Sequence, residues 1–218
     1  MPGVLTSTVG RKYLMGITGL IWAGFVLVHM IGNMLLFVGP DAYNTYSHTL
    51  TSMELIYVAE AILVIALLVH IYCALSLTLS NRAAKNQKYA VKAKVKRSAF
   101  ASSTMGIQGS IVLVFIILHL ITFKYGTEYE TTVHGVAMRD LARLVVEVFQ
   151  NPTVVAWYVV ALVLLGFHLS HGFSSSFQSL GLMNGTYREP LRKLSWAYAI
   201  IVAAGFISQP LYAYFFAH

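Results

Sequence analysis

The sequence predicts an all-α membrane protein, a bundle of five transmembrane helices with the N-terminus in the cytoplasm and the C-terminus outside. Three observations predict it. Apolar residues make up 57% of the 218 residues and charged residues only 11%, against about 25% charged in soluble domains. Five apolar runs are each long enough to cross a bilayer as a helix. The basic residues gather in segments between these runs. This composition excludes disordered, collagen-like and disulfide-rich chains.

The five apolar runs cover about 14–38, 55–79, 105–123, 153–177 and 195–217, and we expect them to form one domain over residues 1–218. Aromatic residues lie near several of their ends, among them Tyr13, Trp157 and Trp196. Such residues form a belt where the hydrocarbon meets the headgroups. The first run is too long for a signal peptide, and no small-residue cleavage site follows it, so we expect it to remain as a span.

Lysine and arginine predict the orientation of the bundle. If five spans alternate, twelve of the fifteen basic residues fall on the side of the N-terminus. They are Arg11, Lys12, the seven within 82–97, Arg188, Arg192 and Lys193. Only Lys124, Arg139 and Arg143 fall on the other side. By the positive-inside rule the N-terminal side is cytoplasmic. The net charge of +7 therefore reflects topology, and we expect no nucleic-acid partner.

Two further segments are too polar to be spans. The basic connector at 82–97 favours contact with anionic lipid, and the alternative is a docking surface for a soluble partner. Residues 138–149 carry apolar side chains at helical spacing with charges on the opposite face. This pattern predicts a short interfacial helix on the outside, with a packing role rather than a chemical one.

Histidines inside the apolar runs are the main candidates for chemistry. Five of the eight histidines lie there, at positions His29, His70, His119, His168 and His171. Ionisable groups are costly in a bilayer and often mark function. One membrane histidine alone is more often a packing residue than a ligand, but here each of the first four spans carries at least one.

The depths of these histidines predict two cofactor levels. Counted from the cytoplasmic ends, His29 and His119 lie about 15 and 14 residues in, and His70 and His168 about 9. At about 1.5 Å per residue the levels differ by roughly 8–9 Å. Each level takes one histidine from each of two helices, which suits a planar cofactor between them. We expect two haem b groups, an outer one ligated by His29 and His119 and an inner one by His70 and His168. An iron with two histidine ligands carries electrons and leaves no site for oxygen.

The surroundings of these histidines give weaker indications. His171 is the alternative to His168, although it lies closer to the inner end than the inner level requires. Four glycines (Gly24, Gly32, Gly166 and Gly172) would allow a macrocycle to approach, but glycine also serves helix packing. Candidate partners for haem propionates are Arg82, Lys193, Arg11 and Lys12 at the inner level and Lys124 or Arg139 at the outer level. The one cysteine, Cys73, excludes an iron–sulfur cluster held by cysteines of this chain.

Several segments together resemble a known family. They are Gly10-Arg11-Lys12-Tyr13-Leu14, Gly19-Leu20 and His29-Met30-Ile31-Gly32-Asn33, then His70 and His119, then 167–173 and 177–181. With these residues the chain resembles the cytochrome b membrane-anchor subunit of succinate dehydrogenase and fumarate reductase, in its single-anchor, five-helix, two-haem form. In that family the fourth-span ligand is the histidine four residues before the glycine, which implies His168 rather than His171. The family's pairing of first with third and second with fourth helix agrees with the depth count.

The resemblance implies an electron-transfer role in a bacterial cytoplasmic membrane. A flavoprotein subunit that carries FAD would interconvert succinate and fumarate in the cytoplasm, and an iron–sulfur subunit would relay electrons. This chain would anchor both and pass electrons through its haems to or from a membrane quinone, menaquinone or ubiquinone. It would take no part in the dicarboxylate chemistry. Some members carry a glutamate two residues before the fourth-span ligand, where this chain has Gly166, so a proton path there is not expected.

A quinone needs proton donors or acceptors within hydrogen-bond reach. Glu60 is the only acid well inside a span and is the first candidate, and Glu54, Tyr57 and Asn33 are weaker ones. Two alternative functions remain. A haem subunit of a nitrate reductase or hydrogenase would typically place two ligands on one helix. A small histidine-using transporter would line a path with polar residues, of which only Glu60 qualifies. His48 and His134 fall in the outer loops, where we expect them to be solvated.

Overall fold

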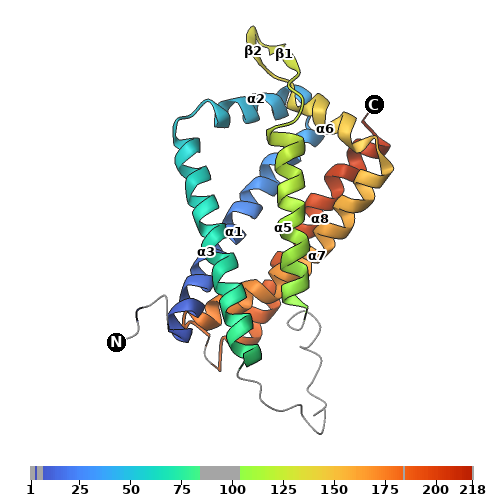
Figure 1. The fold of residues 1–218 in the computed structure, drawn as a ribbon. Coiled ribbons are helices and arrows are strands. Elements are labelled where there is room, and N and C mark those ends of the chain that lie inside the picture. The colour runs from blue at the N-terminus through green and yellow to red at the C-terminus, as the bar shows by residue number, and fades with distance from the viewer. Residues whose placement is uncertain (1–2, 4–6, 84–103, 184, 218) are drawn as a thin grey trace.

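The computed structural model describes residue 3 and residues 7–83, 104–183 and 185–217. Within them the chain forms helices α1 (Thr8–Asn33), α2 (Pro40–Thr51), α3 (Leu55–Ala83), α5 (Met105–His119), α6 (Leu141–Phe149), α7 (Pro152–Ser179) and α8 (Arg188–Phe215). A short 3-10 helix, η1 (Met34–Phe37), follows α1, and a π-helical segment, η2 (Leu120–Lys124), follows α5. Strands β1 (Glu130–Val133) and β2 (Val136–Arg139) form one hairpin (Figure 1).

Five of these helices are long and apolar enough to cross a membrane, which confirms the predicted fold class. They are α1 with η1, α3, α5 with η2, α7 and α8. The observed helices begin or end up to seven residues beyond the predicted limits, as where α8 begins at Arg188 instead of 195. Helices outlast their apolar stretch because the backbone hydrogen bonds continue into the headgroup region. The orientation in the membrane stays a prediction, as does any role of the 82–97 connector, most of which lies outside the described residues.

Local sequence explains where several helices begin. The side chains of Ser7, Asp140 and Asn151 accept hydrogen bonds from backbone N–H groups in the first turns of α1, α6 and α7. These residue types are the preferred N-caps because a short polar side chain satisfies a donor that the helix leaves free. Pro40 and Pro152 occupy the first turns of α2 and α7, where a missing N–H costs nothing.

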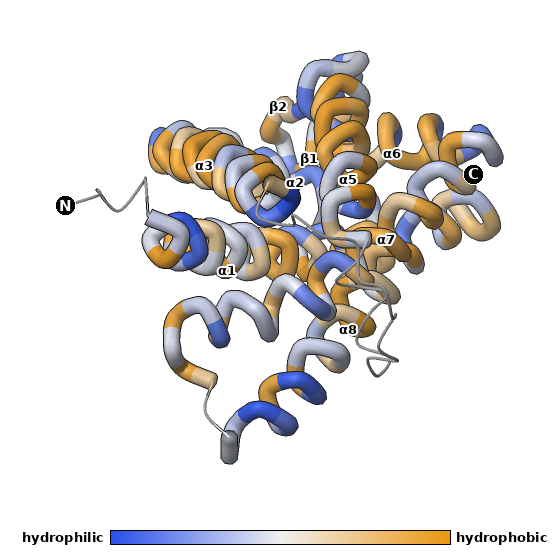
Figure 2. The backbone as a smooth tube through the Cα atoms, turned by 60° about the horizontal axis from the view of Figure 1, so that its bottom comes forward, coloured by the Kyte–Doolittle hydropathy of each residue, from blue (hydrophilic) through white to orange (hydrophobic). Residues whose placement is uncertain are grey.

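Four of the spans stand at the corners of a bundle, and the fifth covers one side of it. Helix α1 packs against α3, α7 and α8, and α7 packs against α5 and α8. Among the described elements, the pairs α1–α5 and α3–α7 are not closely packed, and the end-on view places the two helices of each pair across the bundle from one another, so we call these pairs its diagonals (Figure 2). The end-on view places α1 and α3 on one side and α5 and α7 on the other, with α8 beyond α1 and α7 (Figure 2).

A cap of shorter elements closes the end of the bundle that carries the hairpin. Helix α2 lies across this end and contacts β2 and α6 (Figure 1). Asn44 of α2 is buried, donates to the Asp140 carboxylate at 2.8 Å and accepts from the Ala142 N–H at 2.9 Å. The hairpin turns at His134 and Gly135, both with positive φ, as a tight two-residue turn requires.

The predicted interfacial helix at 138–149 is confirmed only from Leu141 onward. Met138 and Arg139 belong to strand β2, and Asp140 is the N-cap of α6. The apolar spacing that starts at Met138 fits both a helix and a strand, and pairing with β1 favours the strand.

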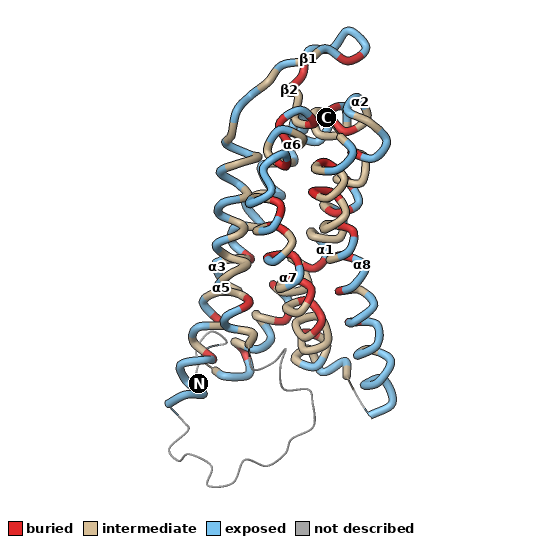
Figure 3. The backbone as a smooth tube through the Cα atoms, turned by 90° about the vertical axis from the view of Figure 1, so that its right-hand side faces the viewer, coloured by how far each residue is buried: buried red, intermediate tan, exposed pale blue. Residues whose placement is uncertain are grey.

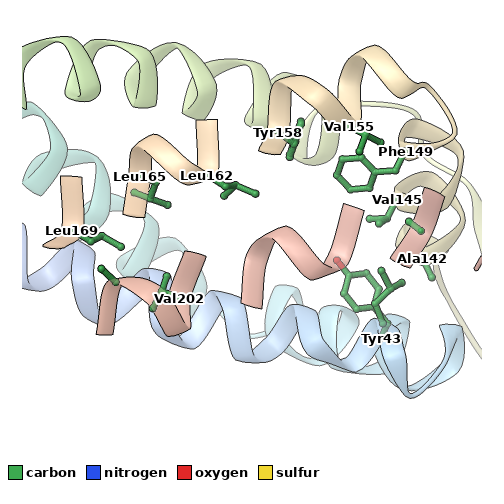
Figure 4. Packing of buried hydrophobic residues seen from close by; sticks show 13 residues of the cluster. Tyr43, Ala142, Val145, Phe149, Val155, Tyr158, Leu162, Leu165, Leu169 and Val202 are labelled. Carbon is green, nitrogen blue, oxygen red and sulfur yellow. The ribbon is translucent and has the colours of Figure 1, made fainter. Parts of the chain in front are cut away.

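The buried core lies beside α7 and α8. Its buried members come from η1, α2, α6, α7 and α8, with Leu162, Leu165 and Leu169 along α7 and Phe149 of α6 beside Tyr158 at the other end of the cluster (Figure 4). Burial is therefore concentrated on one side of the bundle, whereas most of α3 and α5 is exposed or intermediate (Figure 3). In a membrane, such exposed apolar helix faces contact lipid tails.

Candidate functional site

Two histidine rings meet inside the bundle near the end that carries the hairpin, here called the hairpin end. His29 of α1 and His119 of α5 have ring centroids 5.9 Å apart, with planes at 86°. These helices form a diagonal of the bundle, so the imidazoles bridge a space that the backbones do not close. Both residues are partly buried. We call these two the hairpin-end pair.

Aromatic side chains surround the hairpin-end pair. The ring of Phe25 stacks on His29 at 5.3 Å between centroids, and Phe206 of α8 lies at 5.8 Å. Phe115 and Phe123 lie 5.8 and 5.2 Å from the ring of His119. These rings come from α1, α5, η2 and α8. They keep water away from the imidazoles and offer flat apolar faces.

Polar partners orient both rings of the hairpin-end pair. His119 Nδ1 lies 3.3 Å from the Tyr158 hydroxyl of α7. Asn33 places its amide nitrogen 3.4 Å from the ring nitrogens of His29 and donates to the His29 carbonyl at 2.7 Å. Asn33 accepts in turn from the Tyr43 hydroxyl at 2.7 Å. Burial raises the pKa of Tyr43, so this phenol keeps the proton it donates.

A second pair of rings meets nearer the end that carries the N-terminus, here called the N-terminal end. His70 of α3 and His168 of α7 have ring centroids 6.4 Å apart, with planes at 62°. They come from the other diagonal of the bundle. His168, rather than His171, is the α7 histidine in ring contact with His70. We call these two the N-terminal-end pair.

The two rings of the N-terminal-end pair differ in their polar partners. His70 Nδ1 lies 3.2 Å from the Thr18 hydroxyl and hydrogen-bonds to the backbone of Met15. His168 Nδ1 is buried and has no hydrogen-bond partner among the residues that the structure describes. A buried imidazole nitrogen without a partner is costly, and such atoms in native proteins call for an explanation such as an absent ligand or water.

Each ring of the N-terminal-end pair lies against a glycine of a neighbouring helix. A Cβ at Gly19 of α1 would stand 3.5 Å from Cε1 of His70, and one at Gly109 of α5 would stand 3.4 Å from Cε1 of His168. The glycines singled out from the sequence lie elsewhere. Gly32 makes room for the Tyr46 ring, Gly166 packs near Ala203, and Gly24 and Gly172 have open space at their Cβ positions.

Ten residues separate the two levels on three helices. Gly19, beside His70, precedes His29 by ten positions, and Gly109, beside His168, precedes His119 by ten. On α7, Tyr158 at the hairpin-end pair precedes His168 by ten. Ten residues of helix correspond to about 15 Å. This is larger than the sequence estimate of roughly 8–9 Å, because helix ends do not lie at one common level whereas side-chain contacts measure the level directly.

The spacing of the rings in both pairs is compatible with a metal held between two imidazoles. A ligating histidine nitrogen lies about 2.0–2.1 Å from its metal, so two rings on opposite sides have centroids about 6 Å apart. The observed 5.9 and 6.4 Å agree with this spacing. Within the described residues, no cluster of three or more His, Cys, Asp or Glu side chains could hold a bare ion.

The other residues singled out from the sequence are distributed as follows. Glu60 of α3 forms an ion pair with Lys124 of η2. Tyr57 is 70% exposed on α3, and Asn33 bonds to His29 and Tyr43 near the cap. Arg82 and Lys193 are exposed at the N-terminal end, and the structure brings neither to a histidine. Arg11 instead donates to the hydroxyls of Ser76 and Ser80, about two turns of α3 beyond His70.

Sequence reasoning missed Thr18, Gly19, Gly109 and Tyr158. The repeated spacing of ten residues from glycine to histidine on two spans was visible in the sequence and could have indicated the two glycines. Comparison with protein-family models, curated proteins and solved structures finds no match to this chain. The geometry of the two histidine pairs therefore carries the functional argument.

Proposed function

We propose that this chain is the haem-bearing membrane anchor of a succinate dehydrogenase or fumarate reductase. It would pass electrons between an iron–sulfur subunit and a membrane quinone through two haem b groups. The observation that carries the proposal is the pair of opposed imidazoles on each diagonal of the bundle, at two levels ten residues apart. The family resemblance of the motifs around His29 and His168 supports the same reading.

The residues around each histidine pair suit a haem. Imidazole pairs on opposite faces of an iron make a saturated one-electron carrier, which is the chemistry that a bound haem b supplies. Glycines beside His70 and His168 leave room on the helix surface for a flat group, and aromatic rings line the hairpin-end pair. His168 Nδ1 has no partner among the described residues, and this supports a ring whose orientation is completed only when a ligand is bound.

The chain's own residues would hold and orient the histidine rings and shield them from water. Tyr158 and Thr18 each place a hydroxyl oxygen at Nδ1 of one histidine, where it can accept that proton and leave Nε2 for a metal. Asn33 and Tyr43 fix His29 from the cap. Arg11, held by Ser76 and Ser80, is the described cation best placed to pair with a propionate at the N-terminal end, in preference to Arg82 or Lys193.

The two ends of the bundle suit different partners. Basic residues concentrate at the N-terminal end, which supports a cytoplasmic position for this end and docking of the iron–sulfur and flavoprotein subunits there. Electrons would then travel from the N-terminal-end pair to the hairpin-end pair in a bacterial cytoplasmic membrane, or in reverse. The quinone would bind near the hairpin-end pair. A quinone that becomes a quinol takes up two electrons and two protons, and Glu60, the acid within a span on that side, could exchange a proton with it.

Haem content tests the proposal. The full chain, purified from membranes, should contain two haem b groups per chain and give a reduced-minus-oxidised b-type spectrum. Replacing His29 or His119 by alanine should remove one haem, and replacing His70 or His168 should remove the other. His171→Ala and His48→Ala are matched controls, since neither histidine belongs to a pair, and both should retain two.

Reduction by succinate tests the partners. In native membranes, succinate or a quinol should reduce the haem, and His70→Ala should interrupt the transfer from succinate. A colourless chain would refute the haem assignment, and two haems that no dicarboxylate partner reduces would refute the succinate or fumarate role while leaving the cytochrome.

A further inference from the structure

One boundary of the four-helix bundle is loosely packed. The boundary between α1 and α7 is closely packed, and α8 contacts both helices behind it. The opposite boundary lies between α3 and α5, and this pair is not among the closely packed pairs of the described elements. We call this boundary, from Glu60 to His70 on α3 and from Gly109 to Lys124 on α5 and η2, the α3–α5 seam. It faces away from α8 (Figure 2).

An ion pair crosses the α3–α5 seam. Glu60 and Lys124 are in contact, and their side chains remain 40% and 38% exposed. Within the described part of the chain, the one other ion pair joins Glu189 to Arg192 inside α8. Such half-exposed pairs break at little cost, because solvent or a polar ligand replaces each partner. The contact across the seam is therefore one that a ligand with matching polar groups can replace.

The helix that carries Lys124 is irregular, because Lys124 lies in the π-helical segment η2 and not in the α-helix α5. The π segment η2 starts directly after His119, and the Tyr125 N–H bonds to the Leu120 carbonyl at 3.0 Å. A wide turn of this kind adds about one residue, which rotates the following side chains by about 100°. A Cβ at Gly126 would lie 1.9 Å from the Thr122 carbonyl oxygen, so only glycine fits the chain that leaves this turn. Such π segments often occur at functional sites.

Glu60 also stands at the level of the hairpin-end pair. It precedes His70 by ten residues on α3, as Tyr158 precedes His168 on α7. Tyr158 contacts His119, and Glu60 contacts the segment that follows His119. The Glu60–Lys124 ion pair therefore bridges the seam at the level of the hairpin-end pair. In the proposed function, this is the level at which electrons reach a quinone.

We propose that the α3–α5 seam is the lateral route by which a quinone reaches the hairpin-end pair from the lipid, and that Glu60 and Lys124 close this route and bind the quinone ring. The proposal rests on the proposed function. A quinone has an apolar tail that stays in the hydrocarbon and two ring oxygens that need polar partners. The Lys124 ammonium donates to a ring carbonyl, and the Glu60 carboxylate accepts from a ring hydroxyl. The α1–α7 side offers no such route because α8 covers it.

A cross-link across the seam tests the route. In the full chain in membranes, Glu60→Cys and Lys124→Cys are combined and bridged with a bis-maleimide, while Cys73 is fully buried and stays unreacted. The haem is reduced with dithionite, and its reoxidation by a short-chain quinone is timed. Bridging should slow this reoxidation by about tenfold or more relative to the same variant capped with N-ethylmaleimide. Reoxidation by ferricyanide, a small ion that needs no lipid route, should be unchanged.

Two further measurements keep the outcomes distinct. Bridging Glu189→Cys to Arg192→Cys, the ion pair inside α8, is the matched control and should leave the quinone rate unaltered. A photoreactive azidoquinone should label segments 57–64 and 120–125 in the unmodified chain. An unimpaired quinone rate after bridging, or labelling confined to α8, would overturn the route. A chain without a haem spectrum would instead overturn the proposed function, and the labelling pattern still reports on the seam.

Discussion

Helices α7 and α8 are held differently from helices α3 and α5. In the most apolar stretches of α7 and α8, 33% and 39% of the residues are buried, against 17% in each of α3 and α5. The buried core cluster takes members from α7 and α8 and none from the described residues of α3. The half of the bundle formed by α7 and α8 is thus closely packed, whereas the half formed by α3 and α5 buries few side chains against other helices.

The difference indicates what holds the loosely packed half. Lipid tails are as apolar as leucine, so helices in a bilayer associate through close packing and polar links. The α3 helix has close packing with α1 alone. Its other described links include polar and histidine contacts, among them Arg11 to Ser76, Glu60 to Lys124, and His70 to His168. A ligand between the histidines would therefore stabilise α3 and α5 far more than α7 and α8.

If the chain binds haem as proposed, removing this haem should give the largest effect. We expect the full chain produced without haem synthesis to lose about 4 kcal/mol of stability, the linkage for a ligand at about 1,000 times its Kd. Hydrogen exchange should rise sharply in α3 and α5 and little in α7 and α8, because the latter keep their protein contacts. Hydrogen–deuterium exchange with mass spectrometry in detergent measures both. A uniform rise over all five spans would contradict the division into two halves.

Truncating one leucine in each half compares the packing directly. Leu162 of α7 is 4% exposed within the core cluster, and Leu68 of α3 is 61% exposed. Leu162→Ala should lower the free energy of unfolding by about 2–4 kcal/mol, because it leaves a cavity. Leu68→Ala should change it by less than about 0.5 kcal/mol, because lipid fills the space. Thermal unfolding of both variants with haem bound measures the contrast, and equal losses would refute it.

Much of this architecture could be predicted from the sequence because the strongest signals are local. Apolar length sets the spans, and the histidines at 29, 70, 119 and 168 stand out because ionisable groups inside a bilayer are rare. The spacing between the two levels could not be obtained reliably from helix ends, since α1 begins at Thr8 and α3 ends at Ala83, beyond the apolar limits of 14 and 79 from which depth was counted. Contacts between helices were needed to place Gly19 beside His70 and Tyr158 beside His119.

The cap was largely missed for a different reason. Helix α2 has no apolar stretch, although Pro40 and Asp41 in its first turn are ordinary helix-start residues. The hairpin depends on β1 pairing with β2, and its strands are too short for alternation to reveal them. Asn44 contacts Asp140 across 96 positions of sequence, which no local pattern indicates.

The cap joins the two halves through buried polar contacts, and Asn44 tests how much it contributes. Asn44→Ala leaves the Ala142 N–H and the Asp140 carboxylate without their buried partner. We expect a loss of about 1–3 kcal/mol, the usual cost of an unsatisfied buried group. Ser52→Ala is the control, because Ser52 is exposed and its hydroxyl donates to the nearby Thr49 carbonyl of its own helix. Thermal unfolding measures both variants. If the cap joins the two halves, only Asn44→Ala should lower the free energy of unfolding.

Titration of Tyr129 should give the smallest effect. Tyr129 leads from the α5 half into the hairpin, and its hydroxyl hydrogen-bonds to Glu147 of α6, with Arg143 over its ring at 4.1 Å. This hydrogen bond, with burial and the Glu147 charge, raises the pKa of Tyr129 above its usual value, against the opposing effect of Arg143. The stabilising contribution is therefore complete below about pH 10 and is lost as pH rises through the folded-state pKa. Ultraviolet titration curves of the unchanged chain and of Tyr129→Phe should differ by one tyrosine that ionises above the exposed ones. If ionisation of Tyr129 speeds hydrogen exchange in α5 but not in α7, the hairpin stabilises the loosely packed half. Equal changes in α5 and α7 would show that the hairpin stabilises both halves.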